Sequence, residues 1–343
     1  MKFVFSKRLR IAIEIVILGL LALLFLHVLN FRRLQEYISL INLEVIFGVL
    51  LFQLAIQFLH AVQWELILHE AGIARGLWRT FWARISGFAI TYLTPSVTFA
   101  GEPVRATLYK DSSMRYGIVY ATVALDKYIE LFTKLPCIAV GFSFLIFLAH
   151  PGRALIVVAG CILLGFFGFF IFLAAKLLGG GQFIVRLFRR LLSPLERFKP
   201  DILAKIIQAL TEFSTSLHEI IRRRRTFYFA MLTGIAIAVI EVLQTYYILG
   251  VLDNPNLTQS FVIYATVLIQ HAIAFLPGNL GGMEATHLFI FNVLGIGSTR
   301  SFVYTIILRL GQLTMVLLGF MYVLIRRIER VRPGNSHRLH IDL

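Results

Sequence analysis

Long apolar stretches dominate the chain and limit what it can fold into. An α-helix rises about 1.5 Å per residue and the hydrocarbon core of a bilayer is about 30 Å thick, so a membrane span needs roughly 20 largely apolar residues. Six stretches meet this requirement, at 11–29, 44–68, 116–149, 153–178, 226–250 and 299–325. We therefore expect an all-α fold, a polytopic membrane helix bundle.

The composition excludes a water-soluble enzyme. Hydrophobic residues make up 58% of the 343 residues and charged residues only 15%, whereas soluble proteins carry about 25% charged residues. The apolar stretches leave no segment large enough for a separate soluble core. We expect a single integral domain over 1–330 and a short tail over 331–343.

The basic residues predict the orientation of the bundle. The net charge of +15 raises the possibility that the protein binds nucleic acid. However, the lysines and arginines lie in loops between the apolar stretches, as expected when cytoplasmic loops are basic. Four basic regions are placed in the cytoplasm: the N-terminus, 69–84 with Arg84, 176–225 and the tail. The loop 30–43 does not follow this rule, because it carries Arg32 and Arg33 although the order of the spans places it on the outer side. We expect an integral plasma membrane protein of the bacterial inner-membrane type, with both termini cytoplasmic. Membrane lipids are its expected partners, nucleic acid is not, and a homo-oligomer stays open.

A segment at 81–115 is apolar at first but is broken in the middle. Its apolar part, 81–93, ends at Pro95 and reaches only about 20 Å. Charged residues follow the break too soon for a return span. We expect a hairpin that enters from the cytoplasmic side and returns to it.

A second broken segment covers 259–297. It is interrupted at 276–284, where proline and glycines cluster. A re-entrant hairpin and a pair of tilted spans agree equally well with the loop charges. We favour the hairpin, entering from the outer side.

The two breaks suggest an internal repeat. Residues 1–150 and 151–330 each contain two spans, a broken segment and a span, but begin on opposite sides of the membrane. The separations Pro95 to Glu102 and Pro277 to Glu284 are the same, seven positions. Two halves of opposite orientation with interrupted helices are typical of transporters with an inverted-topology repeat.

Irregular backbone at membrane depth predicts a cavity between the halves, because unpaired N–H and C=O groups are not tolerated against lipid. Half-helices that begin near Gly101 and Gly281 would point N–H groups into that cavity, which suits an anionic phosphate. Glu102 and Glu284 would either cap these helices or bind a ligand.

Ionisable residues within the spans are functional candidates, since each costs at least about 2.5 to 3.5 kcal/mol to insert. Arg105 would pair with Glu102 or bind a lipid phosphate. The side chains of Asp126, Lys127, Glu130 and Lys134 share nearby faces of one helix and should point into the bundle. Arg309 and Glu241 need partners elsewhere, and for Asp126 and Arg309 a structural ion pair is the alternative. The full set of cavity candidates is Pro95, Gly101, Glu102, Arg105, Asp126, Glu130, Pro277, Gly278, Gly281, Gly282, Glu284 and Arg309.

We expect neither a metal nor another cofactor, and no catalytic residue. The histidines within apolar stretches, His60, His271 and His287, lack the HExxH spacing of a metalloprotease and should form interior hydrogen bonds. Cys137 and Cys161 form no metal or disulfide pattern and should be buried as small hydrophobic residues.

These motifs resemble a known family. Thr94-Pro95, the sequence Gly-Glu-Pro-Val-Arg at 101–105, the span with Asp126 and Glu130, and Leu-Pro-Gly-Asn-Leu-Gly-Gly-Met-Glu-Ala at 276–285 with Arg309 resemble the transmembrane region of lysylphosphatidylglycerol synthases. The resemblance covers nearly the whole chain. The family includes stand-alone flippase-like proteins, some associated with hopanoid lipids. Because the bifunctional relatives transfer the amino acid with a soluble domain, the resemblance implies lipid translocation without aminoacyl transfer.

Two classes of function follow. The favoured one is a lipid flippase-like, non-enzymatic protein that passes an anionic or aminoacylated lipid head group between leaflets. The alternative is a membrane enzyme of glycosyltransferase type, acting on a lipid phosphate or polyprenyl phosphate with Asp126 and Glu130, or an accessory protein of a lipid pathway such as that of hopanoids.

Overall fold

In the computed structural model, the described residues are 41–94, 100–149, 224–252, 255–272 and 279–331, with parts of 157–172 and 211–220. The long elements of these residues are all helices, which confirms the predicted all-α class. They are α3 (Leu43–Glu70), α4 (Leu77–Leu93), α5 (Gly101–Tyr109), α6 (Tyr116–Ala149), α10 (Arg224–Val251), α11 (Leu257–Ala272), α12 (Gly282–Val293) and α13 (Ser298–Val331).

Four of the described helices are long and apolar enough to cross a membrane. Their candidate spans are Leu43–Glu70, Tyr116–Leu148, Arg225–Val251 and Ser298–Ile325. By length and composition, these helices agree with four predicted spans, at 44–68, 116–149, 226–250 and 299–325. The spans predicted at 11–29 and, for the most part, 153–178 fall outside the described residues.

The first broken segment forms a hairpin of α4 and α5. Helix α4 ends at Leu93, and the next residue, Thr94, adopts the extended conformation expected of a residue before proline. The phenol group of Tyr109, at the end of α5, accepts a hydrogen bond from the backbone N–H of Arg75 (2.8 Å) and donates one to the carbonyl of Ile73 (3.1 Å). The end of α5 therefore lies beside the start of α4, as predicted.

The second broken segment forms a hairpin of α11 and α12. Asn279 and Gly281, with φ of 52° and 80°, adopt left-handed conformations that a helix cannot continue through. Leu252, shortly before α11 begins, and Ile296, shortly after α12 ends, belong to one apolar core cluster. Both ends of this hairpin thus lie on the same side of the bundle.

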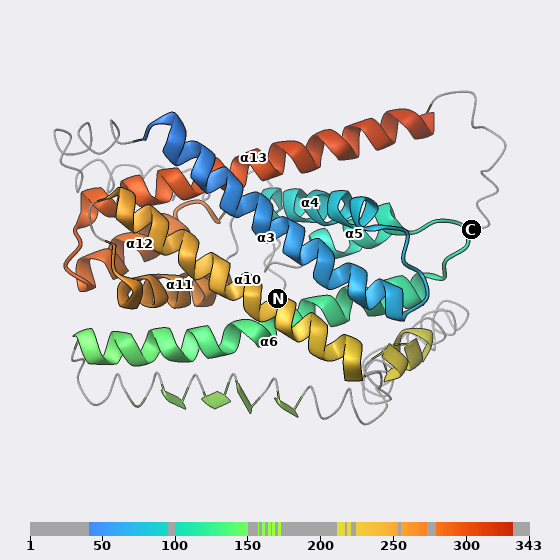
Figure 1. Cartoon of the computed structure of the whole chain (residues 1–343), viewed down its shortest axis with the longest axis horizontal. Coiled ribbons are helices and arrows are strands. Elements are labelled where there is room, and N and C mark those ends of the chain that lie inside the picture. Colours follow the sequence, from blue (N-terminus) through green and yellow to red (C-terminus); the bar gives the residue numbers. More distant parts are fainter. Residues whose placement is uncertain are drawn as a thin grey trace, which may run out of the picture.

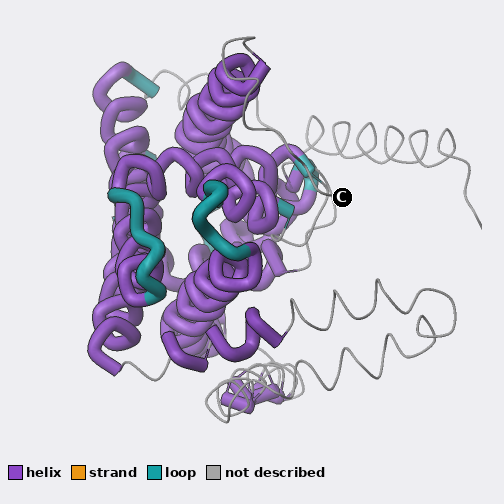
Figure 2. Tube along the Cα trace, turned by 90° about the vertical axis from the view of Figure 1, so that its right-hand side faces the viewer, coloured by secondary structure: helices purple, strands orange, loops and turns teal. Residues whose placement is uncertain are grey.

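The two hairpins lie at opposite ends of the bundle (Figure 1). Helices α3 and α13 run toward the end that holds α4 and α5, whereas α6 and α10 run toward the end that holds α11 and α12. The view along the bundle shows the helices packed side by side and running away from the viewer (Figure 2). The described parts of the two halves thus have opposite directions. The boundaries 1–150 and 151–330 stay a prediction, and the tail lies outside the described residues after Val331.

Glycines allow the first hairpin to pack closely. A Cβ atom added to Gly101 would lie 1.9 Å from the carbonyl oxygen of Gly87, and one added to Gly319 would lie 2.4 Å from that of Ile85. Small residues let membrane helices approach until their backbones touch. Helix α4 is therefore held tightly between α5 and α13.

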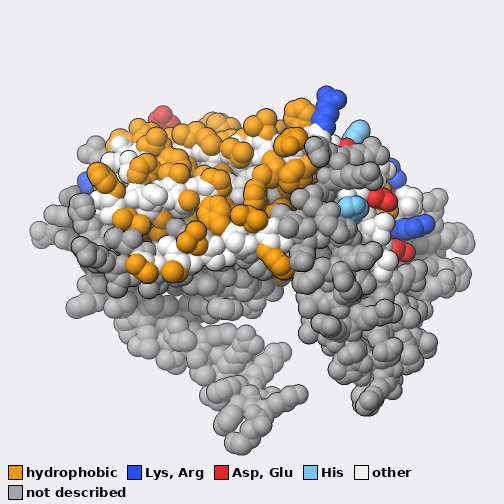
Figure 3. Space-filling model, turned by 90° about the horizontal axis from the view of Figure 1, so that it is seen from below, with side chains coloured by type: hydrophobic (Ala, Val, Ile, Leu, Met, Phe, Trp, Pro, Cys, Tyr) orange, Lys and Arg blue, Asp and Glu red, His pale blue; other side chains and the backbone are white. Residues whose placement is uncertain are grey.

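Polar and apolar side chains are distributed as expected for a membrane protein. Hydrophobic side chains cover most of the described surface in Figure 3, and many of the charged and histidine side chains lie near one end. Large apolar residues such as Leu43, Phe47 and Leu232 are exposed, whereas Gln63, Arg105 and other polar residues are buried. This arrangement leaves apolar surface for lipid and polar groups for the interior.

Candidate functional site

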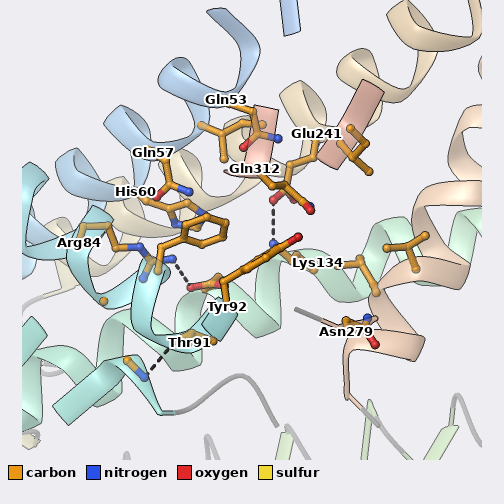
Figure 4. A pocket seen from close by; sticks show the side chains of 18 of the residues that line it. Gln53, Gln57, His60, Arg84, Thr91, Tyr92, Lys134, Glu241, Asn279 and Gln312 are labelled. Atoms are coloured by element: carbon orange, nitrogen blue, oxygen red, sulfur yellow. Dashed lines mark hydrogen bonds and ion pairs between the residues drawn. The ribbon is translucent and has the colours of Figure 1, made fainter. Parts of the chain in front are cut away.

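A cavity of about 260 Å³ lies within the bundle, between the tips of the two hairpins. Every one of the eight long helices contributes to its wall, for example through Gln57 of α3, Arg84 of α4, Lys134 of α6 and Glu241 of α10 (Figure 4). A single water molecule needs only about 10 to 15 Å³ of such space. The cavity is therefore large enough for a polar ligand.

Asp126 lies directly behind one wall of the cavity and is completely buried. Its carboxylate accepts hydrogen bonds from Arg105 (2.6 Å) and Arg84 (3.4 Å) on one oxygen and from Gln63 (2.9 Å) on the other. The guanidinium of Arg105 also lies 4.8 Å from the ring centre of Trp64, within range of a cation–π interaction. Asp126 thus joins α3, α4 and α5 to α6.

Further ion pairs on the same wall face the cavity. Glu130 accepts hydrogen bonds from Arg84 (2.9 Å) and from Lys127 (2.9 Å). Lys127 also lies 3.7 Å from Glu102, which forms an ion pair with Arg105. Together with Asp126, this ionic wall contains three cations and three carboxylates. Its formal charge is balanced, as buried charges in a membrane require.

The second hairpin places a further ion pair beside the cavity. Glu284 accepts a hydrogen bond from the backbone N–H of Gly281 (2.8 Å) and so caps α12. The same carboxylate binds the guanidinium of Arg309 (2.5 Å), which also donates to Tyr92 of α4 (2.8 Å). Glu284 therefore has the predicted capping role and also supplies the partner that Arg309 needed.

Glu102 does not play the same part in the first hairpin. The N–H of Gly101 donates to the hydroxyl of Thr91 (3.0 Å), while Glu102 binds Arg105 and Lys127. A side chain of α4 thus caps the start of α5. This leaves the Glu102 carboxylate at the cavity wall.

Lys134 and Glu241 form a separate ion pair across the cavity, with 3.0 Å between the ammonium and carboxylate groups. The phenol group of Tyr264 donates to the second carboxylate oxygen of Glu241. This contact ties α6, α10 and α11 together and gives Glu241 the partners that the sequence left undefined.

The structure brings most of the predicted site residues to one place. Gly101, Glu102, Arg105 and Glu130 line the cavity, and Asp126 lies directly behind its wall. A second group, at the tip of the other hairpin, consists of Gly281, Gly282, Glu284 and Arg309. The remaining predicted residues, Pro95, Pro277 and Gly278, lie outside the described residues. Whether any of these residues binds a ligand stays a prediction.

Two expectations were wrong. Arg84 is not in a cytoplasmic loop: it is 8% exposed and ion-paired, because α4 begins at Leu77 and carries it two turns into the bundle. Cys161 is exposed and not buried. The described residues Val157 and Leu164 of the same apolar stretch are exposed as well. Cys137 is partly buried.

Sequence reasoning missed a second wall of the cavity, which is made of neutral polar side chains. It consists of Gln53, Gln57 and His60 of α3, Gln244 of α10 and Gln312 of α13. The three residues of α3 follow a spacing of four and three positions, so they share one face of a helix. A polar stripe within an apolar span was the available signal. His60 and His287 are both buried, and His287 contacts the hydroxyl of Thr305 (2.8 Å).

Comparisons with known proteins agree with this architecture. A UPF0104 membrane protein of Pyrococcus horikoshii is 22% identical over 294 residues, which cover 82% of this chain and 87% of the relative. A UPF0104 membrane protein of Methanothermobacter thermautotrophicus is 23% identical over 274 residues, covering 75% and 78%. No solved structure gives a significant match. The family described as lysylphosphatidylglycerol synthase TM region matches residues 11–319. The chain is therefore an integral membrane protein that belongs to the lysylphosphatidylglycerol synthase transmembrane-region family.

Proposed function

We propose that the protein is a lipid flippase-like transporter. It moves the head group of an anionic or aminoacylated lipid between leaflets through the central cavity, while the acyl chains stay in the bilayer. The observation that carries this proposal is a cavity with charged and amide side chains in its wall, to which two hairpins from opposite ends of the bundle both contribute. Such an arrangement is typical of transporters with inverted repeats.

The charges of the cavity fit a lipid head group. Lys127 and Lys134 present ammonium groups that can bind a phosphate, and Glu130 and Glu241 present carboxylates that can bind an ammonium group. Each of these groups is already paired in the protein. A head group can therefore enter by exchanging partners, which avoids leaving a charge unpaired in a membrane interior.

The volume of the cavity is consistent with this division between head group and acyl chains. Its volume of about 260 Å³ is slightly below the range of pockets for drug-sized ligands, about 300 to 1,000 Å³. It has room for a head group and not for two acyl chains, which have to stay in the bilayer. We place the protein in the plasma membrane with both termini in the cytoplasm.

Reconstitution tests this function directly. Purified protein in liposomes should change the leaflet exposure of an anionic or aminoacylated phospholipid labelled on an acyl chain, and the mass of that lipid should stay the same. Liposomes without protein and liposomes with Lys127→Met protein are the controls. The variant should slow the movement, because it removes a cation that faces the cavity.

The alternative, a membrane enzyme, predicts a different result. Recovery of a chemically altered lipid, with turnover abolished by Asp126→Asn, would contradict the transport proposal and favour the enzyme. Asp126 has Arg105, Arg84 and Gln63 as hydrogen-bond donors. These contacts support a structural role for this carboxylate and so favour transport.

A further inference from the structure

The neutral wall of the cavity contains polar atoms that have no partner. Gln57, His60 and Gln244 are each 3% to 4% exposed. The Gln57 Oε1, His60 Nδ1, Gln244 Nε2 and Gln312 Oε1 atoms are buried and have no hydrogen-bond partner. Figure 4 shows Gln57, His60 and Gln312 directed toward the same space. Polar atoms that are buried without a partner are rare, so this set needs an explanation.

Other polar side chains near these atoms do have hydrogen-bond partners, and they show which donors and acceptors remain unused. Gln53 donates to the amide oxygen of Gln244 (3.2 Å), so one end of this amide pair is used and the Nε2 of Gln244 is left over. On the ionic wall, each carboxylate has a cationic partner, and the Glu102 Oε2 and Arg105 Nε atoms pair with each other. Gln63 Oε1 and Arg84 Nε are also buried there without a hydrogen-bond partner among the described residues. The four atoms of the neutral wall differ in that they belong to uncharged side chains that line the cavity.

The chemistry of these groups indicates the ligand. An amide offers a donor and an acceptor at one place, and neutral imidazole does the same. A hydroxyl group also donates and accepts, so several hydroxyls on adjacent carbons match this wall. An ammonium group only donates and would leave the Nε2 of Gln244 without an acceptor.

We propose that the neutral wall binds the hydroxyl groups of an uncharged polyol or sugar unit in the transported head group. The phosphate of the same lipid then lies toward Lys127 and Arg84 on the ionic wall. This inference rests on the proposed transport function and specifies its substrate class: an anionic phospholipid whose head group ends in several hydroxyls.

Three lipids of equal charge test this inference. Phosphatidylglycerol, phosphatidylinositol and phosphatidylethanol each carry one phosphodiester, but the last has no free hydroxyl. In liposomes, the protein should move the two hydroxyl-bearing lipids about tenfold faster than phosphatidylethanol, the effect of one or two neutral hydrogen bonds. Gln57→Leu should reduce this preference to less than about twofold. Gln259→Leu, at the start of α11 and outside the cavity, should preserve it.

The possible failures are distinguishable. Equal rates for the three lipids with wild-type protein would overturn this inference and leave the transport proposal intact. If no lipid moves, the transport proposal fails. The inference about the neutral wall is then tested by native mass spectrometry of the purified protein with each lipid. It would be overturned if the protein retains phosphatidylinositol no better than phosphatidylethanol. If Gln57→Leu does not fold, Gln312→Leu on α13 replaces it with the same expected loss of preference.

Discussion

Arg309 of α13 donates a hydrogen bond to the phenol oxygen of Tyr92 of α4, 2.8 Å away, and the same guanidinium binds Glu284 of α12. Tyr92 lies near the tip of the first hairpin and Glu284 near the tip of the second. One side chain therefore joins two hairpins that enter the bundle from opposite ends. Any movement of one tip away from the other has to break this chain of bonds.

This link predicts the effect of Tyr92→Phe. The variant loses one hydrogen bond to a charged group, so its free energy of unfolding should fall by about 1 to 2 kcal/mol. Thermal unfolding of the purified protein in detergent measures this change. Tyr228→Phe, at a position that is 67% exposed, is the control and should have little effect. Equal stability of the two variants would contradict the link.

The buried pair of Arg105 and Asp126 predicts strong coupling between the two residues. Arg105→Met leaves the Asp126 carboxylate with less compensation, so it should destabilise the protein by about 3 to 5 kcal/mol. Adding Asp126→Leu should recover part of this loss, because the unpaired buried charge is removed. A double-mutant cycle on thermal stability gives the coupling energy. Strictly additive effects would show that the two residues do not interact.

The close contact of α4 and α5 predicts that Gly101 cannot be replaced. Gly101→Ala places a Cβ atom 1.9 Å from a backbone oxygen, which requires the hairpin to separate, and we expect loss of folded protein. Gly250→Ala is the control, because its Cβ would find its nearest neighbour at 3.7 Å. That change should be neutral or stabilise the helix by up to about 1 kcal/mol. Folded yield by size-exclusion chromatography compares the two.

Asp111, in the loop between α5 and α6, predicts a pH dependence. The Ser113 hydroxyl donates a hydrogen bond to its carboxylate, and with further bonds from the Ser113 backbone N–H and from Arg75 this lowers the pKa of Asp111 below its ordinary value of 3.8. A carboxylate with a lowered pKa stabilises the folded state above the ordinary value, and this contribution is lost as the pH falls through the folded pKa.

Asp111→Asn should therefore be less stable than wild type at pH 6, and the difference should shrink as the pH falls below 3.8. Thermal unfolding at a series of pH values measures it. A difference that stays constant over this range would show that ionisation of Asp111 is not involved.

Much of the fold follows from local features of the sequence. The length of each apolar stretch decides whether it can span the membrane, so 44–68 and 226–250 agree with α3 and α10 within a few residues. The two breaks follow from proline and glycine, which act on the backbone at their own positions.

The site is less accessible to sequence reasoning, because its contacts join distant residues. Arg84 resembles a loop charge until α4 is known to begin at Leu77, and only the folded bundle brings it to Glu130. Gln57 and Gln312 carry no charge, so they cost less to insert into a membrane than an arginine. Their presence in an apolar span is therefore a weaker indication of function. Their importance depends on the cavity that they share.

The central claim, that lipid moves through this cavity, is tested most directly by blocking it. In a protein with Cys137→Ala and Cys161→Ala, a single cysteine is placed at Gln312, on the cavity wall, or at Leu317, which is 64% exposed on the same helix. Both are labelled with a bulky thiol reagent that forms a disulfide. We predict that labelling at Gln312→Cys stops lipid movement in liposomes, that reductant restores it, and that labelling at Leu317→Cys has no effect. Complete labelling at Gln312→Cys with unchanged lipid movement would contradict the account.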